Sequence, residues 1–527
     1  MKKKYRYWKE KMKFYITTPI YYVNDRPHIG HAYTTIIADI LARWKRLNNF
    51  DVYFLTGTDE HGVKIVNAAK NKSITPLQLC NTMSSKFKKS WNILNISYTK
   101  FVRTTNFEHI NVVTKVINLL FKKGLLFEKQ YKGLYCIGCE RFYTKKELDK
   151  KGNCLLHKKK AIFFSEKNYF FKLSHFQEQI LDILTNVNNK NYMEILPKER
   201  MHEIVGKLKL GLEDISLSRN NLNWGISLPF DKEQTVYVWI DALLSYISGI
   251  NYSLNNELFQ KIWPANVHFI GKDILWFHAV IWPAILISLE LPLPKRIYSH
   301  GFFSINNCKM SKSLGNVIPP DKVINKYGIE ATRYLLVSLF PLGVDGDISW
   351  SVLSKKYNKD LADNLGNLIC RVIKMYEKYF NFNLPLLEKK KGLILAKKIS
   401  FSLKENFISN MNNVQFYMAI KFLQKNITLV NKQIEYDSPW KLVNSQENEN
   451  KLTICIYSYL QAIVLITIYL KPFMPSLAEK IQKKLCSVDT ENAINNFFIN
   501  GAMIPKDGFS LSKKKINLGI IFPKIKD

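Results

Sequence analysis

The sequence is poor in cysteine and, among its cations, poor in arginine. Eight cysteines are spread over 527 residues, too few for a disulfide scaffold, so we expect a reducing, cytoplasmic environment. Lys and Arg exceed Asp and Glu by 77 − 43 = 34, and only 11 of the 77 cations are arginine. Such a surplus favours a polyanionic partner. Lys, Asn and Ile also share A/T-rich codons, so a biased genome explains the charge equally well, and charge alone identifies no function.

Export and membrane signals are lacking as well. The basic N-terminus, residues 1–15, has no apolar core and no small-residue cleavage site, which excludes a secretory signal. The uncharged run 452–470 approaches a transmembrane length. It contains Thr453, Ser458 and Gln461 and stands alone in the sequence. We therefore expect a helix buried on nearly all sides of a bundle, and no membrane partner.

Strand and helix patterns alternate at the start of the chain. Residues 13–18 and 51–57 are strand-like, and the segment from Ile29 to Arg46 has apolar residues at helical spacing. This order predicts a βαβ unit and a parallel, Rossmann-like sheet. Ligands of such sheets bind beyond the C-terminal strand ends, where the turn 28–31 falls.

The predicted α/β domain is interrupted by an insertion and followed by a helical domain. A polar segment bearing Lys and Cys occupies 125–225, after which strand-like pieces return at 236–240 and 267–271. From about 355 the pattern is helical, with one apolar face marked by Phe416, Ile420, Leu423, Ile427 and Val430. We expect four parts, with boundaries at 1–124 and 226–354 for the two halves of the α/β domain, 125–225 for the insertion and 355–527 for an all-α domain.

The tetrapeptide His28-Ile29-Gly30-His31 opens the first predicted helix. Helix N-termini favour phosphates, because their N–H groups and dipole point at the anion. The two imidazoles lie on one side of the first turn, and Gly30 allows close approach to the backbone. Two capping or surface histidines would give the same tetrapeptide, so on its own it decides nothing.

A second motif, Lys309-Met310-Ser311-Lys312-Ser313, combines two lysines and two hydroxyls in a predicted loop. Such a loop can hold a triphosphate and neutralise the charge of departing pyrophosphate. Alone it is ordinary in a lysine-rich chain. Together and in this order, the two motifs resemble the joint fingerprint of class I aminoacyl-tRNA synthetases, letter for letter.

Three cysteines and one histidine form two pairs in the insertion: Cys136, Cys139, Cys154 and His157. Three thiolates and one imidazole at this spacing are typical of a closed, tetrahedral and structural zinc site. Four residues without a metal, in a polar segment, are the alternative.

Further segments resemble the methionyl-tRNA synthetases in particular. They are ITTPIYYVNDRPHIGH (16–31), FLTGTDEHG (54–62), YVWIDAL (237–243), HFIGKDILWFH (268–278), HGFF with the following KMSKSLGN (300–316), LGNLICR (365–371), SPWKL (438–442) and LKPFMPSLAEKI (470–481). The resemblance runs from about residue 14 to the final GIIFPKI. It implies a Rossmann-like catalytic domain split by a zinc-knuckle insertion and followed by an all-α anticodon-binding bundle.

The resemblance implies a methionine pocket and an ATP site. The implied pocket is apolar and aromatic, which suits a thioether, and consists of Ile20, Tyr22, Trp239, Ala242, Tyr246, Phe277 and His278, with Asp59 for the substrate ammonium. The implied residues for ATP are His28, Gly30, His31, Gly271, Asp273, Lys309 and Lys312, with Mg²⁺ accompanying the nucleotide.

The resemblance also implies two reactions and a tRNA partner. Methionine is activated by ATP to the adenylate, and is then transferred to the terminal ribose of initiator and elongator tRNA. Asn367, Arg371 and Trp440 are the implied anticodon readers. Since the chain ends without an appended C-terminal domain, we expect a monomer.

Two rival hypotheses remain open. One is another class I synthetase without an editing domain. Synthetases that carry such a domain are disfavoured, because His28 and Lys309 are only 281 positions apart. The other is a basic RNA-binding protein that has kept the fold and lost catalysis. The intact motifs and zinc ligands speak against it.

Overall fold

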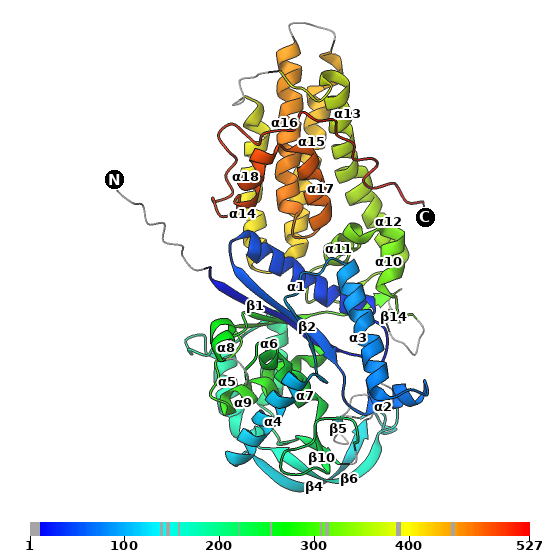
Figure 1. The fold of residues 1–527 in the computed structure, drawn as a ribbon, viewed down its shortest axis with the longest axis vertical. Coiled ribbons are helices and arrows are strands. Elements are labelled where there is room, and N and C mark those ends of the chain that lie inside the picture. The colour runs from blue at the N-terminus through cyan, green and yellow to red at the C-terminus, as the bar shows by residue number, and fades with distance from the viewer. Residues whose placement is uncertain are drawn as a thin grey trace, which may run out of the picture.

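The computed structural model describes most of the chain (Figure 1). The described residues are 11–136, 141–143, 148–155, 159–220, 222–252, 256–305, 308–310, 316–385, 391–443 and 448–526. An α/β body fills one half of the molecule and a helical bundle projects from it. The predicted fold class is confirmed.

A parallel six-stranded sheet forms the centre of the α/β body. Its strands, in spatial order, are β3 (Lys100–Arg103), β2 (Asp51–Asp59), β1 (Lys13–Tyr22), β11 (Val267–Gly271), β12 (Arg296–His300) and β7 (Glu194–Leu196). The predicted strands at 13–18, 51–57 and 267–271 are confirmed. The order reverses between β1 and β11, and ligands bind at such a switch point, beyond the C-terminal strand ends.

Helices cover both faces of this sheet. They are α1 (Ile29–Leu47), α2 (Val63–Lys70), α3 (Pro76–Ile93), α4 (Phe107–Lys122), α7 (Val238–Ser248), α8 (Asn256–Ile262), α9 (Trp282–Ser288), α10 (Pro320–Tyr327) and α11 (Ile329–Ser338). One apolar core joins the sheet to α1, α3 and α11, and a second joins it to α4, α7 and α9.

One expectation about the middle of the chain is wrong. The segment 236–240 was expected to be a strand, but β10 (Gln234–Val236) ends there and α7 begins at Val238. Nearly every residue of α7 is buried, so its sequence shows no amphipathic period that distinguishes a helix from a strand. The predicted insertion, 125–225, also supplies the edge strand β7 of the central sheet, which pairs with β12.

The rest of the insertion forms a curved antiparallel sheet with two helices. The strands β4 (Leu126–Cys136), β5 (Arg141–Tyr143), β6 (Ile162–Phe171) and β8 (Ile215–Ser216) pair in the order β5-β4-β6-β8, β9 (Ser218–Asn220) pairs with β10, and the helices are α5 (Gln177–Thr185) and α6 (Lys198–Leu208). Figure 1 shows β4 and β6 at the end of the body that lies opposite the bundle.

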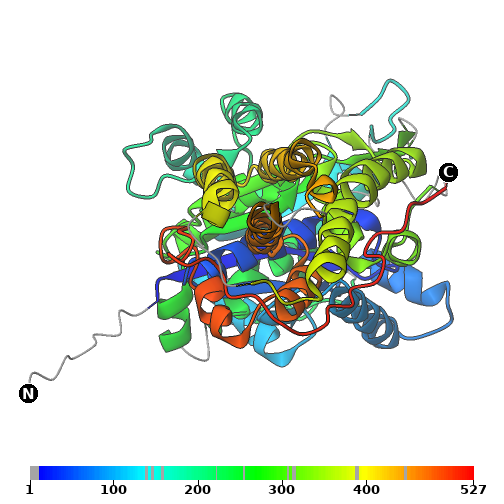
Figure 2. The ribbon, with the colours of Figure 1, turned by 90° about the horizontal axis from the view of Figure 1, so that it is seen from above.

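The bundle follows α12 (Trp350–Tyr357) and a π-helical segment, Asn358–Gly366. Its helices are α13 (Asn367–Phe380), α14 (Ile394–Asn412), α15 (Phe416–Asp437), α16 (Glu449–Leu470), α17 (Pro475–Leu485) and α18 (Glu491–Asn495). The view from above shows α16 near the centre, with the other helices around it (Figure 2). Although α16 is long and apolar enough to cross a membrane, 94% of its apolar window is buried inside the protein, so its predicted burial is confirmed.

Body and bundle share a buried junction. The Arg333 side chain is fully buried and donates to Asp39 of α1 at 2.6 Å and to the carbonyl of Phe473, before α17, at 3.1 Å. Asp39 also accepts from Arg43 and from Ser97 at 2.7 Å. Arg333 therefore links the middle of α1, the helix that begins with the His28 motif, to the base of the bundle.

Candidate active site

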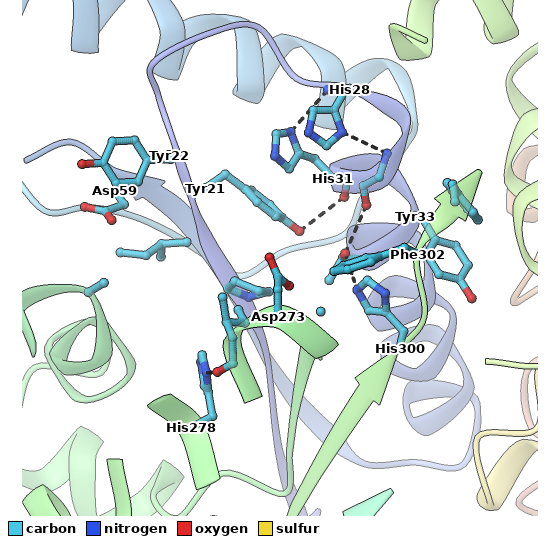
Figure 3. A pocket seen from close by; sticks show the side chains of 18 of the residues that line it. Tyr21, Tyr22, His28, His31, Tyr33, Asp59, Asp273, His278, His300 and Phe302 are labelled. Atoms are coloured by element: carbon cyan, nitrogen blue, oxygen red, sulfur yellow. Dashed lines mark hydrogen bonds between the residues drawn. The ribbon is translucent and has the colours of Figure 1, made fainter. Parts of the chain in front are cut away.

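A cavity of about 410 Å³ opens at the C-terminal edge of the central sheet. The ends of four neighbouring strands contribute to it, through Tyr22, Asp59, Gly271 and His300. In Figure 3, His28 and His31 lie together at one side, Tyr22 and Asp59 at a second, and His300 and Phe302 at a third. The sheet thus brings together residues from distant parts of the sequence.

The two histidines of the first motif cap α1. Nδ1 of His28 accepts from the N–H of Gly30 at 3.1 Å, and Nδ1 of His31 accepts from the N–H of His28 at 3.3 Å. Their rings stack with centroids 3.6 Å apart. Because each Nδ1 is an acceptor, each ring carries its proton on Nε2. The capping alternative is therefore correct, and it coexists with exposure of both residues to the cavity.

Two glycines keep the cavity open beside these groups. A side chain at Gly30 would place its Cβ 3.0 Å from the His28 ring and 3.6 Å from Met310. One at Gly271 would place it 2.7 Å from Oδ1 of Asp273. Asp273 itself lines the cavity, near its centre in Figure 3.

An aromatic slot forms the other side of the cavity. Trp239 and Ala242 from α7 line it with Ile20, Tyr22 and Tyr246. Phe277 is not among the described lining residues; its ring stacks on the back of Trp239 at 4.0 Å. The structure thus brings the other predicted pocket residues to one cavity and places Phe277 one layer behind its wall.

The slot is electrically neutral at its base. Nδ1 of His278 faces the carbonyl of Ile274 at 2.9 Å and so carries the proton, which leaves Nε2 to accept from the Tyr246 hydroxyl at 2.7 Å. Burial lowers the pKa of His278 to about 4, a shift partly offset by the Ile274 contact. Both groups are therefore uncharged near neutral pH. Asp59, only 6% exposed, is the acidic group at the Tyr22 side of the slot.

The second motif is only partly within the described residues. Lys309 belongs to β14 (Cys308–Lys309), which pairs with β13 (Phe303–Ile305), and Met310 lines the cavity. The described backbone therefore leads this motif to the cavity rim. Lys312 lies outside the described residues.

The predicted zinc ligands divide in the same way. Cys136 at the end of β4 and Cys154 are buried in one small apolar cluster with Tyr143, Leu148 and Ala161. Cys139 and His157 lie outside the described residues. Within the described part of the chain no group of three or more His, Cys, Asp or Glu side chains could hold a metal ion.

Two of the three predicted anticodon residues, Arg371 and Trp440, are in contact on the bundle. The Arg371 guanidinium lies 5.1 Å from the centroid of the Trp440 ring and pairs with Glu435. Trp440 is 41% exposed. Asn367 is exposed one turn before Arg371 on α13.

Comparison with known proteins identifies the family. A family model described as "tRNA synthetases class I (M)" matches residues 14–154 and 146–373. The methionine–tRNA ligase of Thermotoga maritima is 39% identical over 478 residues, which cover 90% of this chain and 75% of that relative. The chain belongs to the methionine–tRNA ligases. The ligase of Synechocystis sp. is 40% identical over 90% of this chain and 89% of its own length.

Solved methionyl-tRNA synthetase structures match nearly the whole chain. The Mycobacterium tuberculosis enzyme in complex with methionyl-adenylate matches with a TM-score of 0.90 at 31% identity, over 97% of this chain and 100% of that one. The apo form of the same enzyme matches with a TM-score of 0.83 at 28% identity, over 98% and 99%.

Sequence reasoning missed several residues around the cavity of this methionine–tRNA ligase. The described lining also includes Tyr21, Tyr33, Thr34, His300 and Phe302. Thr34 and His300 bond across the cavity floor at 2.8 Å, and burial lowers the pKa of His300 to about 4. The signal was present, since His300 and Phe302 precede the lysine motif in a segment that resembles the family.

A buried network behind the slot was also missed. Asp241, 1% exposed on α7, accepts from Nδ1 of His61 at 2.7 Å and from Nε2 of His109 at 2.6 Å. Burial alone would raise the pKa of Asp241, but the charge of His61 and the hydrogen bonds from both histidines outweigh it and lower the pKa to about 2. Asp241 is therefore ionised at every physiological pH.

Proposed function

We propose that the cavity at the C-terminal edge of the sheet is where this methionine–tRNA ligase joins methionine to ATP. The chain belongs to a family that activates methionine as methionyl-adenylate, releases pyrophosphate and transfers methionine to its tRNA. One observation supports the proposed location. The two stacked histidines that cap α1 line the same cavity as the aromatic slot, which is uncharged at its base and carries Asp59 at one end.

Methionine fits the slot by chemistry. A thioether is apolar and polarisable and packs well against aromatic rings such as Trp239 and Tyr22. Since Tyr246 and His278 are uncharged, a charged side chain would lose its hydration there without compensation. The Asp59 carboxylate would pair with the substrate ammonium, in a charge-assisted hydrogen bond.

ATP would lie between the α1 N-terminus and the ends of β11 and β12. Nε2–H of His28 and of His31 would donate to phosphate oxygens, and the helix N-terminus adds its positive end. Gly271 and Asp273 would hold the ribose, and Lys309 and Lys312 the β- and γ-phosphates. Mg²⁺ accompanies ATP in reactions of this type.

The chemistry needs positioning and charge stabilisation, and no covalent enzyme intermediate. A methionine carboxylate oxygen attacks the α-phosphorus, the bond from that phosphorus to the α,β-bridging oxygen breaks, and pyrophosphate leaves with the electron pair. The 2′-hydroxyl of the terminal tRNA ribose then attacks the carbonyl carbon of the adenylate. AMP leaves, and methionine is ester-linked to tRNA.

One structural zinc ion would stabilise the insertion. The donor set fits, because Cys136 and Cys154 are buried together and buried thiolates need a cation for compensation. Cys139 and His157 would complete four ligands. Bound zinc would crosslink the loops and would take no part in the reaction.

The far end of the bundle would read the anticodon. Trp440 offers an exposed ring for base stacking, and Asn367 and Arg371 offer hydrogen bonds on the neighbouring helix. The predicted division into residues 1–124, 125–225, 226–354 and 355–527 would then separate catalysis, zinc binding and anticodon reading. We further propose a monomeric, cytoplasmic enzyme without a membrane partner.

ATP–pyrophosphate exchange with each of the twenty amino acids, without tRNA, tests this proposal. Exchange with methionine alone is the expected result. Exchange with another amino acid would overturn the assignment of the slot. Absence of exchange from folded, zinc-loaded protein would favour the non-catalytic RNA-binding hypothesis.

A further inference from the structure

The strand β2 ends at Asp59, and the segment from there to Gly62, called the turn 59–62 below, is held from several sides. The Glu60 carboxylate accepts from Arg103 at 2.7 and 2.9 Å. The Trp224 indole donates to the Glu60 carbonyl at 2.6 Å, and the Tyr22 hydroxyl donates to the His61 carbonyl at 2.7 Å. These contacts fix the turn to β3 and β1, but none of them reaches α7.

The His61 side chain supplies the bond to α7. Its Nδ1 lies 2.7 Å from Asp241, which also binds Nε2 of His109, whose Nδ1 lies 2.7 Å from Ser248 Oγ. None of these four residues is more than 6% exposed. An ionised carboxylate only accepts, so both imidazoles donate N–H to Asp241. Charge-assisted hydrogen bonds of this kind are about twice as strong as neutral ones.

Asp241 stands between two residues of the slot, Trp239 and Ala242, on a helix that is buried along nearly its whole length. Apolar packing holds α7 in place without Asp241. The turn 59–62 is buried as well, but hydrogen bonds hold it, and the residues that line the cavity in the described structure include neither His61 nor Asp241. The hydrogen bond between them therefore joins the acidic end of the slot to its aromatic wall from outside the cavity.

We propose that Asp241, acting through His61, is a positioning residue that sets the place of Asp59 relative to α7 and so determines affinity for the amino group of methionine. This inference rests on the proposed pairing of the substrate ammonium with Asp59. A displacement of about 1 Å at such a contact can lower kcat/KM for methionine by up to about 100-fold. Since the ammonium takes no part in bond making, the loss should appear in KM rather than in kcat.

The test compares His61→Leu with His61→Asn in ATP–pyrophosphate exchange by the full chain. Leucine removes the donor to Asp241, whereas the asparagine amide places an N–H close to the position of the imidazole Nδ1–H. We expect His61→Leu to raise the KM for methionine about 10- to 100-fold, with kcat within about three-fold and KM for ATP unchanged. His61→Asn should stay within about three-fold of the parent.

A methionine analogue without the amino group, 4-(methylsulfanyl)butanoate, separates positioning from general damage. As a competitive inhibitor it cannot use Asp59, so its inhibition constant should be the same for the parent and for His61→Leu. An equal loss of methionine and of the analogue would mean that the whole slot is disrupted, and would overturn the proposal. Unchanged methionine KM in His61→Leu would overturn it as well.

Two more variants, Asp241→Asn and Asp59→Asn, complete the test. If His61→Leu does not fold, Asp241→Asn takes its place; its amide has one acceptor oxygen for two imidazole donors, so the same selective rise in KM is expected. The variant Asp59→Asn separates the proposed ammonium site from the proposed positioning role of Asp241. If Asp59→Asn itself spares methionine relative to the analogue, the proposed ammonium site is wrong; if it weakens methionine while His61→Leu and Asp241→Asn do not, only the positioning role is wrong.

Discussion

The cavity and the far end of the bundle hold their functional side chains in different ways. In the cavity, His28 and His31 are fixed by backbone capping, and Asp59 belongs to a turn bonded to β1, β3 and α7. At the far end, Trp440 is 41% exposed and Arg371 pairs with Glu435, whose side chain is 62% exposed. Buried hydrogen bonds build one site, and surface contacts build the other.

The difference follows from what each site is proposed to bind. A small substrate gains affinity when the ordering of the protein has already taken place during folding. Splayed anticodon bases need side chains that can turn toward them. An exposed ion pair contributes about 0–1 kcal/mol, so Arg371 can leave Glu435 for a base at little cost. Mutations should therefore affect the two sites to different degrees and in different assays.

The largest effect is expected from His28. In His28→Asn the side chain can still cap α1, because asparagine is a favoured N-cap residue, but the Nε2–H donor is lost. The kcat of ATP–pyrophosphate exchange should fall about 10²- to 10³-fold, as for other lost transition-state donors. The melting temperature should match the parent, whereas His28→Ala should lose about 1 kcal/mol of stability. Exchange within three-fold of the parent in His28→Asn would show that this histidine is only a cap.

Trp440→Ala should give the next largest effect, on tRNA alone. Stacking contributes about 1–3 kcal/mol per base, which corresponds to a 10- to 100-fold loss in kcat/KM for tRNA charging. Exchange without tRNA should be unchanged. Phe401→Ala is the matched control, since Phe401 is an aromatic residue of the same bundle, 68% exposed on α14. Equal charging by the two variants would contradict the proposed role of Trp440.

Short-range patterns predicted much of the cavity, and long-range contacts supplied the rest. The helix at 29–46 and the strands around it followed from periodicity. The three-residue spacing of His28 and His31 predicted that their rings lie on one side of the first turn, and the structure adds that they stack. Asp241 illustrates the limit. In sequence it is one acidic residue in an apolar run, and its two histidines lie 180 and 132 residues away. No local pattern shows such a contact.

The start of α7 was predicted wrongly and β7 was not predicted, for the same physical reason. The segment that begins α7 contains valine, tryptophan and isoleucine, which favour strands, but burial on all sides of a packed helix overrides this preference. The three-residue strand β7 is too short to show alternation and is defined by its pairing with β12. Both elements are determined by their neighbours rather than by their own residues.

A groove along α15 tests whether the lysine surplus serves RNA. Lys359, Lys421 and Lys425 line a hollow of about 520 Å³ and are exposed, with no acidic partner among the described residues. If they contact tRNA phosphates, replacing all three by glutamine should reduce the slope of log affinity against log salt by about 2.7. The charging kcat/KM should fall about ten-fold near 0.15 M salt.

The control for this groove has the same charge change elsewhere on the bundle. Lys397, Lys398 and Lys404 are exposed on α14. Replacing these three by glutamine should leave the salt slope unchanged if attraction to tRNA is local. Equal reductions in both triple variants would indicate that the surplus acts only through net charge.

The smallest effect is expected from pH, which should hardly change methionine binding near neutrality. Because burial lowers the pKa of His278 to about 4, the ring is neutral above about pH 5 and accepts from Tyr246. As pH falls through 4 the ring gains a proton on Nε2 and can no longer accept, so methionine binding should weaken toward acid pH. Between pH 5 and 7.5 the KM for methionine in exchange should therefore vary by less than about two-fold. A rise in KM centred near pH 6.5, the ordinary pKa of histidine, would mean that water reaches His278 and that the slot is not the dry, neutral pocket that distinguishes it from the exposed end of the bundle.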